Sequence, residues 1–265
     1  MQSRITVILI LSLLTAGTLA RAQDIGTYEA RFHPVGSDTL PYRISYPVNF
    51  SPEGSYPVIF FLHGSGERGK DNIKQLVHGS RLLDTSTVRN IHEAIVIIPQ
   101  CPESSYWSNV LISYHKSGER DFSFPMDQNP TVAMTLLLDL VDSVISRSYI
   151  NRKMIYAGGL SMGGMGTFEL VARRPGIFAA AFPICGGANP ATVSKYDTRT
   201  KFWIFHGLED NVVPSRLSEE MAAALVKNGI DVKITLYEGV GHNSWDSAFA
   251  EPNLLLWLFS KEIKN

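Results

Sequence analysis

Ser161 has a glycine two positions away on each side, so that Gly159, Ser161 and Gly163 form the pattern G-x-S-x-G. An apolar run beginning at Met154 precedes the serine, and a helix is predicted to follow it to about Arg174. A chain that reverses within one residue between a strand and a helix lifts that residue's hydroxyl above the strand end. Glycines on both sides remove Cβ atoms that would collide. The pattern is typical of a nucleophilic serine, although by itself it also fits a glycine-rich turn before a helix.

A serine hydroxyl is a weak nucleophile until a base accepts its proton, and the base in turn needs an acid to orient it. His242 lies on a glycine-flanked loop after the last predicted strand, and no other histidine follows His206. Asp210 follows the preceding strand, and the side chain of the adjacent Glu209 is expected to point the opposite way. The order serine, acid, histidine along the chain therefore predicts that Ser161, Asp210 and His242 act together.

A reaction at a carbonyl also needs N–H donors where negative charge develops on the carbonyl oxygen. The residue after the nucleophile supplies one donor, which makes the backbone N–H of Met162 the first candidate. The second candidate is the N–H of Ser65, in the loop that follows a buried strand over 56–62. That loop lacks the spacing and the lysine of a phosphate-binding loop. His63 and His206 each precede a glycine at a strand end, and both are interpreted as structural residues.

The elements that must position these residues alternate between strand-like and helix-like segments. Strands are predicted over 27–34, 40–46, 56–62, 94–99, from 154 up to the serine, 178–184, 202–205 and 232–237. Helices are predicted from 71 or 72 to about 83, from a cap at Asn129 and a first residue Pro130 onward, from the serine to about 174, over 215–227 and from about 252 to 261. This order predicts one α/β domain over residues 23–265, with a mostly parallel central sheet and helices on both faces. Sites in such sheets lie beyond the carboxyl ends of the strands, so we expect the candidate residues to meet at one edge.

The N-terminus has the pattern of a secretory signal peptide. Arg4 is the only charge before an apolar run from Ile5 to about Leu14, and small residues with Ala20 and Ala22 complete a cleavage site. The apolar run is short for a membrane anchor, which needs about 20 residues. We therefore expect residues 1–22 to be removed, the protein to be secreted or periplasmic, and no stable membrane span to remain after processing.

The composition limits which classes of partner the protein is expected to bind. A formal net charge of −1 without a basic run gives no electrostatic surface for nucleic acid, and 45% hydrophobic residues suit a globular protein with a sizeable core. No cluster of cysteine and histidine has zinc-ligand spacing, so neither a metal nor a cofactor is predicted. Cys101 and Cys185 follow strands on opposite sides of the serine strand, which favours two free, half-buried thiols over one disulfide.

Together, these motifs resemble the secreted α/β-hydrolases of the phospholipase/carboxylesterase-like and "predicted peptidase" group. The segments that carry the resemblance are 62–69, 99–102, 159–164, 206–214 and 241–242. Feruloyl-esterase-like and polyhydroxybutyrate-depolymerase-like enzymes are similar in fold and in their catalytic triad. The resemblance implies an α/β-hydrolase fold in which Ser161, Asp210 and His242 are the triad and Ser65 and Met162 are the oxyanion donors. It does not imply one substrate.

The substrate is expected to bind in an open cleft. The segment 186–201 between two predicted strands is too short for a large cap domain, and the segment 100–128 is expected to wall the cleft. Trp107 and Tyr106 in that wall either stack on an aromatic acyl group or a sugar ring, or pack the segment down.

Three functions are compatible with these residues. The first is hydrolysis of carboxylic esters, small or linked to polysaccharide, through an acyl-enzyme intermediate. The second is a serine peptidase of the prolyl-oligopeptidase-like type with the same triad, which ranks lower because no propeller or peptide-gripping domain is present. The third is a non-catalytic binding protein, against which the complete set of candidate residues argues.

Overall fold

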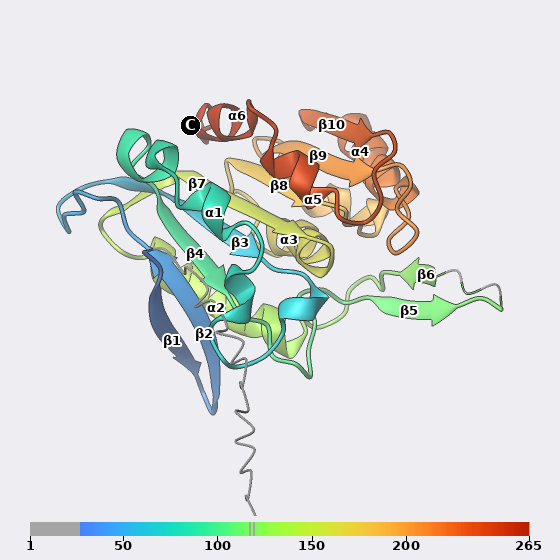
Figure 1. Cartoon of the computed structure of the whole chain (residues 1–265), viewed down its shortest axis with the longest axis horizontal. Coiled ribbons are helices and arrows are strands. Elements are labelled where there is room, and N and C mark those ends of the chain that lie inside the picture. The colour runs from blue at the N-terminus through green and yellow to red at the C-terminus, as the bar shows by residue number, and fades with distance from the viewer. Residues whose placement is uncertain (1–26, 117, 119, 265) are drawn as a thin grey trace, which may run out of the picture.

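The computed structural model describes residues 27–116, 118 and 120–264 (Figure 1). The predicted signal peptide, residues 1–22, lies outside the described residues. Within the described part of the chain, no helix has the length and apolar character needed to cross a membrane.

The centre of the molecule is an eight-stranded sheet in the order β1-β2-β4-β3-β7-β8-β9-β10. Its strands are β1 (Glu29–Val35), β2 (Asp38–Ser45), β3 (Tyr56–Leu62), β4 (Ile95–Pro99), β7 (Ile150–Leu160), β8 (Ala180–Ile184), β9 (Lys201–Gly207) and β10 (Val232–Tyr237). Strands β1 and β2 form an antiparallel hairpin, β2 pairs antiparallel with β4, and every pair from β4 to β10 is parallel. The predicted mostly parallel sheet is confirmed.

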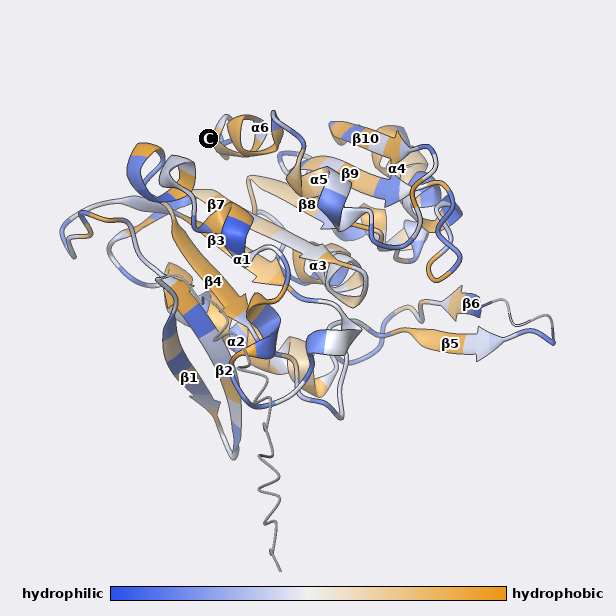
Figure 2. Ribbon diagram, in the orientation of Figure 1, coloured by the Kyte–Doolittle hydropathy of each residue, from blue (hydrophilic) through white to orange (hydrophobic). Residues whose placement is uncertain are grey.

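Helices cover both faces of this sheet, as Figure 1 shows. They are α1 (Ser80–Leu83), α2 (Val132–Ile145), α3 (Met162–Arg173), α4 (Arg216–Lys227), α5 (Trp245–Phe249) and α6 (Leu254–Phe259). Strand β3 shows why two cores form. Successive side chains of a strand point to opposite faces, so Val58 and Phe60 join the core with α2, α3 and α4, whereas Ile59 and Phe61 join the core with α1, α5 and α6. Every residue of β3 is therefore buried, and the five residues from Val58 to Leu62 all lie on the hydrophobic side of the scale used in Figure 2.

The prediction of one continuous helix that ends at about Leu83 is wrong. The segment is divided into a 3-10 turn, Lys74–Leu76, and the short helix α1. The break lies at Gly79, whose φ of +82° is a left-handed conformation, and a Cβ there would lie 2.6 Å from the ring of Phe61. Asp71, one of the two residues at which the helix was expected to begin, lies before this turn, and its Oδ1 accepts hydrogen bonds from the N–H groups of Ile73 and Lys74, whereas the N-cap position of the turn is Ile73.

Two other helix boundaries differ from the prediction. The helix expected to begin at Pro130 begins at Val132, because Thr131, not Asn129, is its cap and accepts a hydrogen bond at Oγ1 from Met134 N–H at 3.0 Å. The helix expected over 252–261 is limited to α6, and a separate helix α5 precedes it. The segment between β8 and β9 holds only a short 3-10 helix, Pro190–Lys195, so no large cap is inserted there.

The segment 100–128, expected to be a loop, contains an antiparallel hairpin of β5 (Leu111–Tyr114) and β6 (Arg120–Ser123). It projects beyond the edge toward which the parallel strands point (Figure 1). All four residues of β5 are exposed, so this strand has no alternation of buried apolar and exposed polar positions from which it could be predicted. Phe122 anchors the hairpin, because it is buried against Met165 and the start of α4.

Helix α3 crosses the end of β3 with no space between the two backbones. A Cβ on Gly163 would overlap the carbonyl oxygen of Leu62, and one on Gly159 would lie 2.5 Å from the carbonyl oxygen of Gly163. Backbone atoms cannot move aside as a flexible side chain can. The two outer glycines of G-x-S-x-G are therefore required by the close approach of α3, β3 and β7.

We predict that Gly163→Ala lowers the free energy of unfolding by about 3 kcal/mol, the upper range for overpacking a rigid site. Gly66→Ala is the matched control, since a Cβ at Gly66 meets nothing within 4 Å, and its effect should stay within about 0.5 kcal/mol. Urea unfolding of both variants measures the difference. Equal stability of Gly163→Ala and wild type would contradict the rigid crossing.

Candidate active site

Ser161 lies at the turn between β7 and α3, in a backbone conformation that serine rarely adopts. Its φ is +53° and its ψ is −117°, and holding a non-glycine residue there costs about 1–3 kcal/mol. Two backbone hydrogen bonds secure this conformation: Ser161 N–H donates to Ile184 O at 2.9 Å, and Met165 N–H donates to Ser161 O at 3.0 Å. The turn lifts the hydroxyl out of the strand at the carboxyl edge of the sheet.

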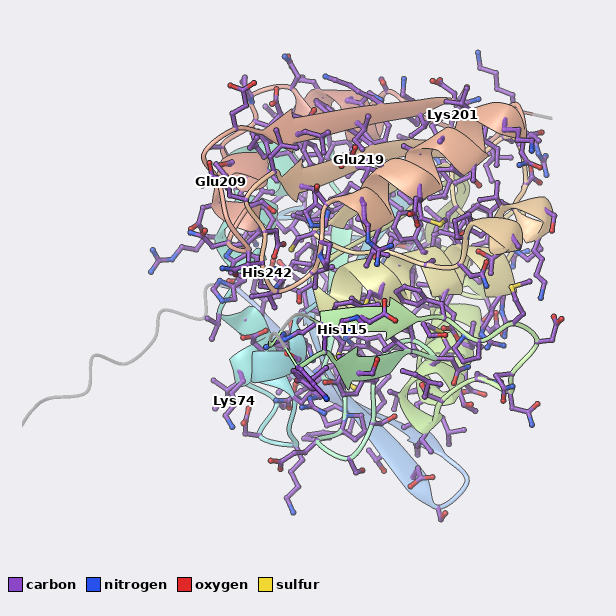
Figure 3. All side chains as sticks on the ribbon, turned by 90° about the vertical axis from the view of Figure 1, so that its right-hand side faces the viewer. Lys74, His115, Lys201, Glu209, Glu219 and His242 are labelled. Carbon is purple, nitrogen blue, oxygen red and sulfur yellow. The ribbon has the colours of Figure 1, made fainter. Side chains whose placement is uncertain are left out.

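Three side chains that lie far apart in the sequence form one hydrogen-bonded line at this edge. His242 Nε2 lies 3.0 Å from Ser161 Oγ, and His242 Nδ1 lies 2.7 Å from Asp210 Oδ2. They come from the ends of β7, β9 and β10, and Figure 3 shows His242 at this end of the molecule, with the hairpin that leads to His115 nearby. The structure thus brings together the three residues that the sequence selected for nucleophile, acid and base.

The carboxylate of Asp210 is fully buried and receives four hydrogen bonds, whereas the neighbouring Glu209 is exposed. Oδ1 accepts from the N–H groups of Val212 and Val213, each at 2.9 Å, and Oδ2 accepts from two histidines. Burial alone would raise the pKa of this carboxyl, but the hydrogen bonds from His206, His242 and Val213 outweigh it and hold the pKa well below its usual range. Asp210 is therefore a fixed negative charge beside His242.

His206 contacts the candidate acid Asp210 directly. The sequence had indicated only a structural role for this histidine, without a contact to the acid. Its Nε2 lies 3.1 Å from Asp210 Oδ2 and 2.9 Å from the carbonyl oxygen of Val213. Both partners only accept hydrogen bonds, so this nitrogen carries a proton. Its Nδ1 lies 2.7 Å from Ser218 Oγ at the start of α4. His206 thus helps to fix the position of Asp210 through Oδ2, the same oxygen that His242 contacts.

His63 is a buried structural histidine. Its Nε2 accepts a hydrogen bond from Cys101 N–H at 2.9 Å, so its Nδ1 is the protonated nitrogen and donates to Gly64 O at 2.6 Å. Burial lowers the pKa of His63 to about 4, which keeps the ring neutral near pH 7. The ring ties the loop after β3 to the loop after β4.

The two N–H groups expected to bind an oxyanion lie on loops that flank Ser161. Met162 is the first residue of α3, where the N–H has no acceptor within the helix. Ser65 begins the 3-10 turn Ser65–Glu67 after β3 and is exposed. Its loop lies against the serine turn, since a Cβ on Gly64 would be 2.9 Å from Leu160 Cδ1. The two candidate donors are thus carried by segments that meet at Ser161.

The prediction that Trp107 stacks on a substrate is wrong. The side chain is completely buried, packs against α3 at Gly166, and presents its ring edge-on to His63 at 5.5 Å. Tyr106 is half-buried, and the guanidinium of Arg68 lies 4.6 Å from its ring centre. The alternative, that this segment is packed down onto the body, holds for Trp107.

An aromatic residue that the sequence did not single out lies closer to the candidate base. The half-buried ring of Trp245 contacts His242 edge to face at 5.5 Å and also lies 5.2 Å from His78. Trp245 lies only three residues after His242, at the start of α5, and this proximity in the sequence could have indicated that the two side chains are in contact. Trp245 therefore packs against the imidazole of His242.

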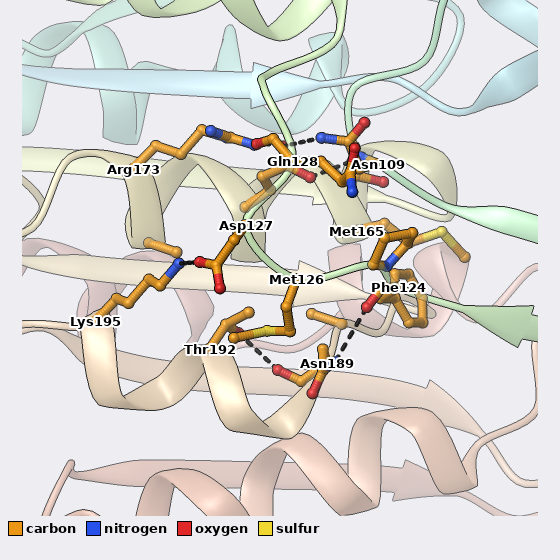
Figure 4. Close-up of a pocket in the computed structure, with 15 residues that line it drawn as sticks. Asn109, Phe124, Met126, Asp127, Gln128, Met165, Arg173, Asn189, Thr192 and Lys195 are labelled. Atoms are coloured by element: carbon orange, nitrogen blue, oxygen red, sulfur yellow. Dashed lines mark hydrogen bonds and ion pairs between the residues drawn. The ribbon is translucent and has the colours of Figure 1, made fainter.

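A pocket on the outer face of α3 does not include Ser161 or His242 (Figure 4). It lies between α3 and the segment 124–128, which is fastened over it by three bonds: Asn189 Nδ2 to Phe124 O at 3.1 Å, Arg173 to Gln128 O at 3.0 Å, and Lys195 to Asp127 at 2.7 Å. Met165 lines its end nearest the serine turn. This pocket is adjacent to the site but separate from it.

Both cysteines are free, as predicted. Cys101 and Cys185 are fully buried rather than half-buried, and they follow β4 and β8, on opposite sides of β7.

Comparisons with known proteins agree with this geometry. Residues 50–252 match the model of a family described as phospholipase/carboxylesterase. Lysophospholipase-like protein 1 of Mus musculus is 25% identical over 201 residues, which cover 72% of this chain and 82% of that protein. Among solved structures, a thermostable esterase is 30% identical to this chain, with a TM-score of 0.78. The match covers 89% of this chain and 64% of the esterase chain. A ferulic acid esterase shares the fold, with 16% identity, a TM-score of 0.63 and coverage of 88% of this chain and 97% of that one.

We predict that His63 makes the protein less stable as the pH falls. An unfolded histidine binds its proton near pH 6.5, but folded His63 does so only near pH 4, so the unfolded state gains protons first on acidification. About 3 kcal/mol of stability should be lost between pH 7 and pH 4. Urea unfolding should show a weaker pH dependence in His63→Gln, whereas His115→Gln, which removes an exposed histidine, should follow wild type. Identical pH dependence in wild type and His63→Gln would contradict a buried neutral ring.

Proposed function

Because the chain belongs to the phospholipase/carboxylesterase family and has the α/β-hydrolase fold, we propose that it is a serine hydrolase that cleaves carboxylic esters through an acyl-enzyme. The observation that carries the proposal is the line of hydrogen bonds from Ser161 Oγ through His242 to the buried Asp210 carboxylate. Family membership and the likeness to a thermostable esterase support ester hydrolysis as the reaction.

In the acylation step, Ser161 Oγ attacks the ester carbonyl carbon while His242 Nε2 accepts the hydroxyl proton. Positive charge then develops on the imidazole, and the anionic Asp210 stabilises it through the Nδ1–H bond. Negative charge develops on the carbonyl oxygen, toward which the N–H groups of Met162 and Ser65 are proposed to point. His242 next donates its new proton to the leaving alcohol oxygen, so that the carbon–oxygen bond breaks and the acyl group stays on the serine.

Deacylation repeats the sequence with water as the nucleophile. His242 accepts a proton from the water as its oxygen attacks the acyl carbon, and it returns the proton to Ser161 Oγ when the acid leaves. His242 must gain and lose a proton twice in each turnover. A permanently ionised Asp210, held by His206 and two backbone N–H groups, suits that role because the base keeps its orientation in both protonation states.

We propose extracellular or periplasmic esters as substrates, either small acyl compounds or acyl groups linked to polysaccharide. The signal-peptide pattern of residues 1–22 supports export, and the short segment between β8 and β9 leaves the site without a large cap. A feruloyl group is one candidate acyl group, since a ferulic acid esterase shares the fold. Trp245, beside His242, is the aromatic surface now favoured for an aromatic acyl or alcohol group, in place of Trp107.

We predict that Ser161→Ala lowers kcat by roughly 10⁴–10⁶-fold with little change in substrate binding, because it removes the nucleophile but no binding surface. A fluorophosphonate probe should label the wild type and leave Ser161→Ala unlabelled. A folded wild-type protein that resists the probe, or equal labelling of the variant, would show that Ser161 is not an activated nucleophile.

A comparison of kcat/KM among p-nitrophenyl esters, feruloyl esters and peptide amides separates the ester from the peptidase function. We expect the esters to be preferred, because an amide requires stronger protonation of its leaving group and residues 27–264, as far as the structure describes them, form one α/β domain without a second one to grip a peptide. A preference for peptide amides over activated esters of matched acyl groups would overturn the ester assignment while leaving the triad intact.

A further inference from the structure

A buried thiol lies against the acid and base of the candidate active site. The sulfur of Cys185, a carboxylate oxygen of Asp210 and a ring nitrogen of His242 all lie within 4.8 Å of one another. The three residues come from the loops after β8, β9 and β10, which are neighbours in the sheet. Sequence spacing could not indicate this cluster, because its members are 25 or more residues apart.

We propose that Cys185, Asp210 and His242 form a binding site for one thiophilic divalent cation, such as Zn²⁺ or Cd²⁺, which inhibits the enzyme when bound. The donor set of one sulfur, one imidazole nitrogen and one carboxylate oxygen suits soft and borderline ions, whereas Mg²⁺ and Ca²⁺ prefer oxygen ligands alone. Three protein ligands that leave a fourth position open are a common arrangement around zinc.

The charges balance in this site. The cation takes the place of the proton shared by His242 Nδ1 and Asp210 Oδ2, which are 2.7 Å apart. The Cys185 thiol releases its proton to solvent and binds as thiolate, while the imidazole proton moves from Nδ1 to Nε2. Two positive charges of the ion meet one thiolate and one carboxylate, so the buried complex carries no net charge, as a low-dielectric site requires.

This binding mode would stop catalysis without touching Ser161. With the ion on Nδ1, His242 carries its proton on Nε2, the atom that must accept the serine proton, and therefore cannot act as a base. His206 would remain hydrogen-bonded to Asp210 and orient the carboxylate toward the ion, the usual role of a residue behind a metal ligand. The side chain of His242 is 20% exposed, which gives the ion a path from the cleft.

Protons compete with the ion for this site. Burial above all, together with the charge of Asp210, raises the pKa of the Cys185 thiol, although the Ser161 backbone and the buried Ser244 hydroxyl oppose that shift. Asp210 stays ionised, and His206 also donates to its Oδ2, so the thiol must release its proton before the sulfur can bind the ion.

The test measures Cd²⁺ and Zn²⁺ inhibition of ester hydrolysis in the wild type, Cys185→Ala and Cys101→Ala. Cys101 is the matched control, since it is a second buried free thiol on the other side of β7. We expect Cys185→Ala to raise the inhibition constant by at least about 10-fold, because losing a ligand should cost no less than losing a residue that hydrogen-bonds to a ligand. Cys101→Ala should follow wild type, Mg²⁺ should not inhibit, and a chelator should restore activity.

A spectroscopic titration tests metal binding independently of the proposed ester hydrolysis. Binding of Cd²⁺ to a thiolate produces an ultraviolet charge-transfer band, which should appear in wild type and Cys101→Ala and be absent from Cys185→Ala, whether or not esters are hydrolysed. Cys185→Ser, which keeps the volume of the side chain, serves if the alanine variant folds poorly. Equal inhibition constants for wild type and both Cys185 variants, or a band that disappears with Cys101 instead, would overturn the proposal.

Discussion

The structure depends on the close crossing of α3 over the ends of the central strands. Three glycines of this helix start have no room for a Cβ: Gly163 is against the end of β3, Gly164 is against the end of β8, where a Cβ would lie 2.5 Å from Ile184 O, and Gly166 is against Trp107. These contacts fix where α3 begins. The serine that joins β7 to α3 must then adopt its strained conformation, and its hydroxyl is presented at a defined height above the sheet.

The second constraint is a buried negative charge. Asp210 has no solvent contact, so its charge must be compensated by donors from within the protein. Val212 and Val213 supply backbone N–H groups, His206 supplies one ring N–H from β9, and His242 supplies the last from the loop after β10. Electrostatic compensation therefore orients the proposed base: the same hydrogen bond that stabilises the carboxylate aims Nε2 of His242 at Ser161. The proposed metal site uses this compensation as well, with a cation in the place of a proton.

Much of the fold could be predicted because buried parallel strands have a simple sequence signature. The ranges of β3 and β10 follow from continuous or alternating apolar residues, and the order of Ser161, Asp210 and His242 follows from the chain order that the fold imposes. What could not be predicted depends on contacts between distant segments. From the sequence, Trp107 could be an exposed aromatic residue, and only its contact with Gly166 of α3 shows that it is buried. His206 was expected to hydrogen-bond to loop backbone, and its contact with Asp210 depends on where the fold places that carboxylate. The hairpin β5–β6 was not predicted, because every side chain of β5 is exposed and that strand has no alternation of apolar and polar residues.

The central claim is that Ser161 carries the acyl group during turnover. The most direct measurement is mass spectrometry of the intact protein, quenched in acid during hydrolysis of an ester whose acyl group leaves slowly, followed by peptide mapping. We expect one acyl group per chain, located on the peptide that contains Ser161 and absent from Ser161→Ala. Hydrolysis that proceeds without any acylated protein, or an acyl group found on another residue such as Cys185, would contradict it.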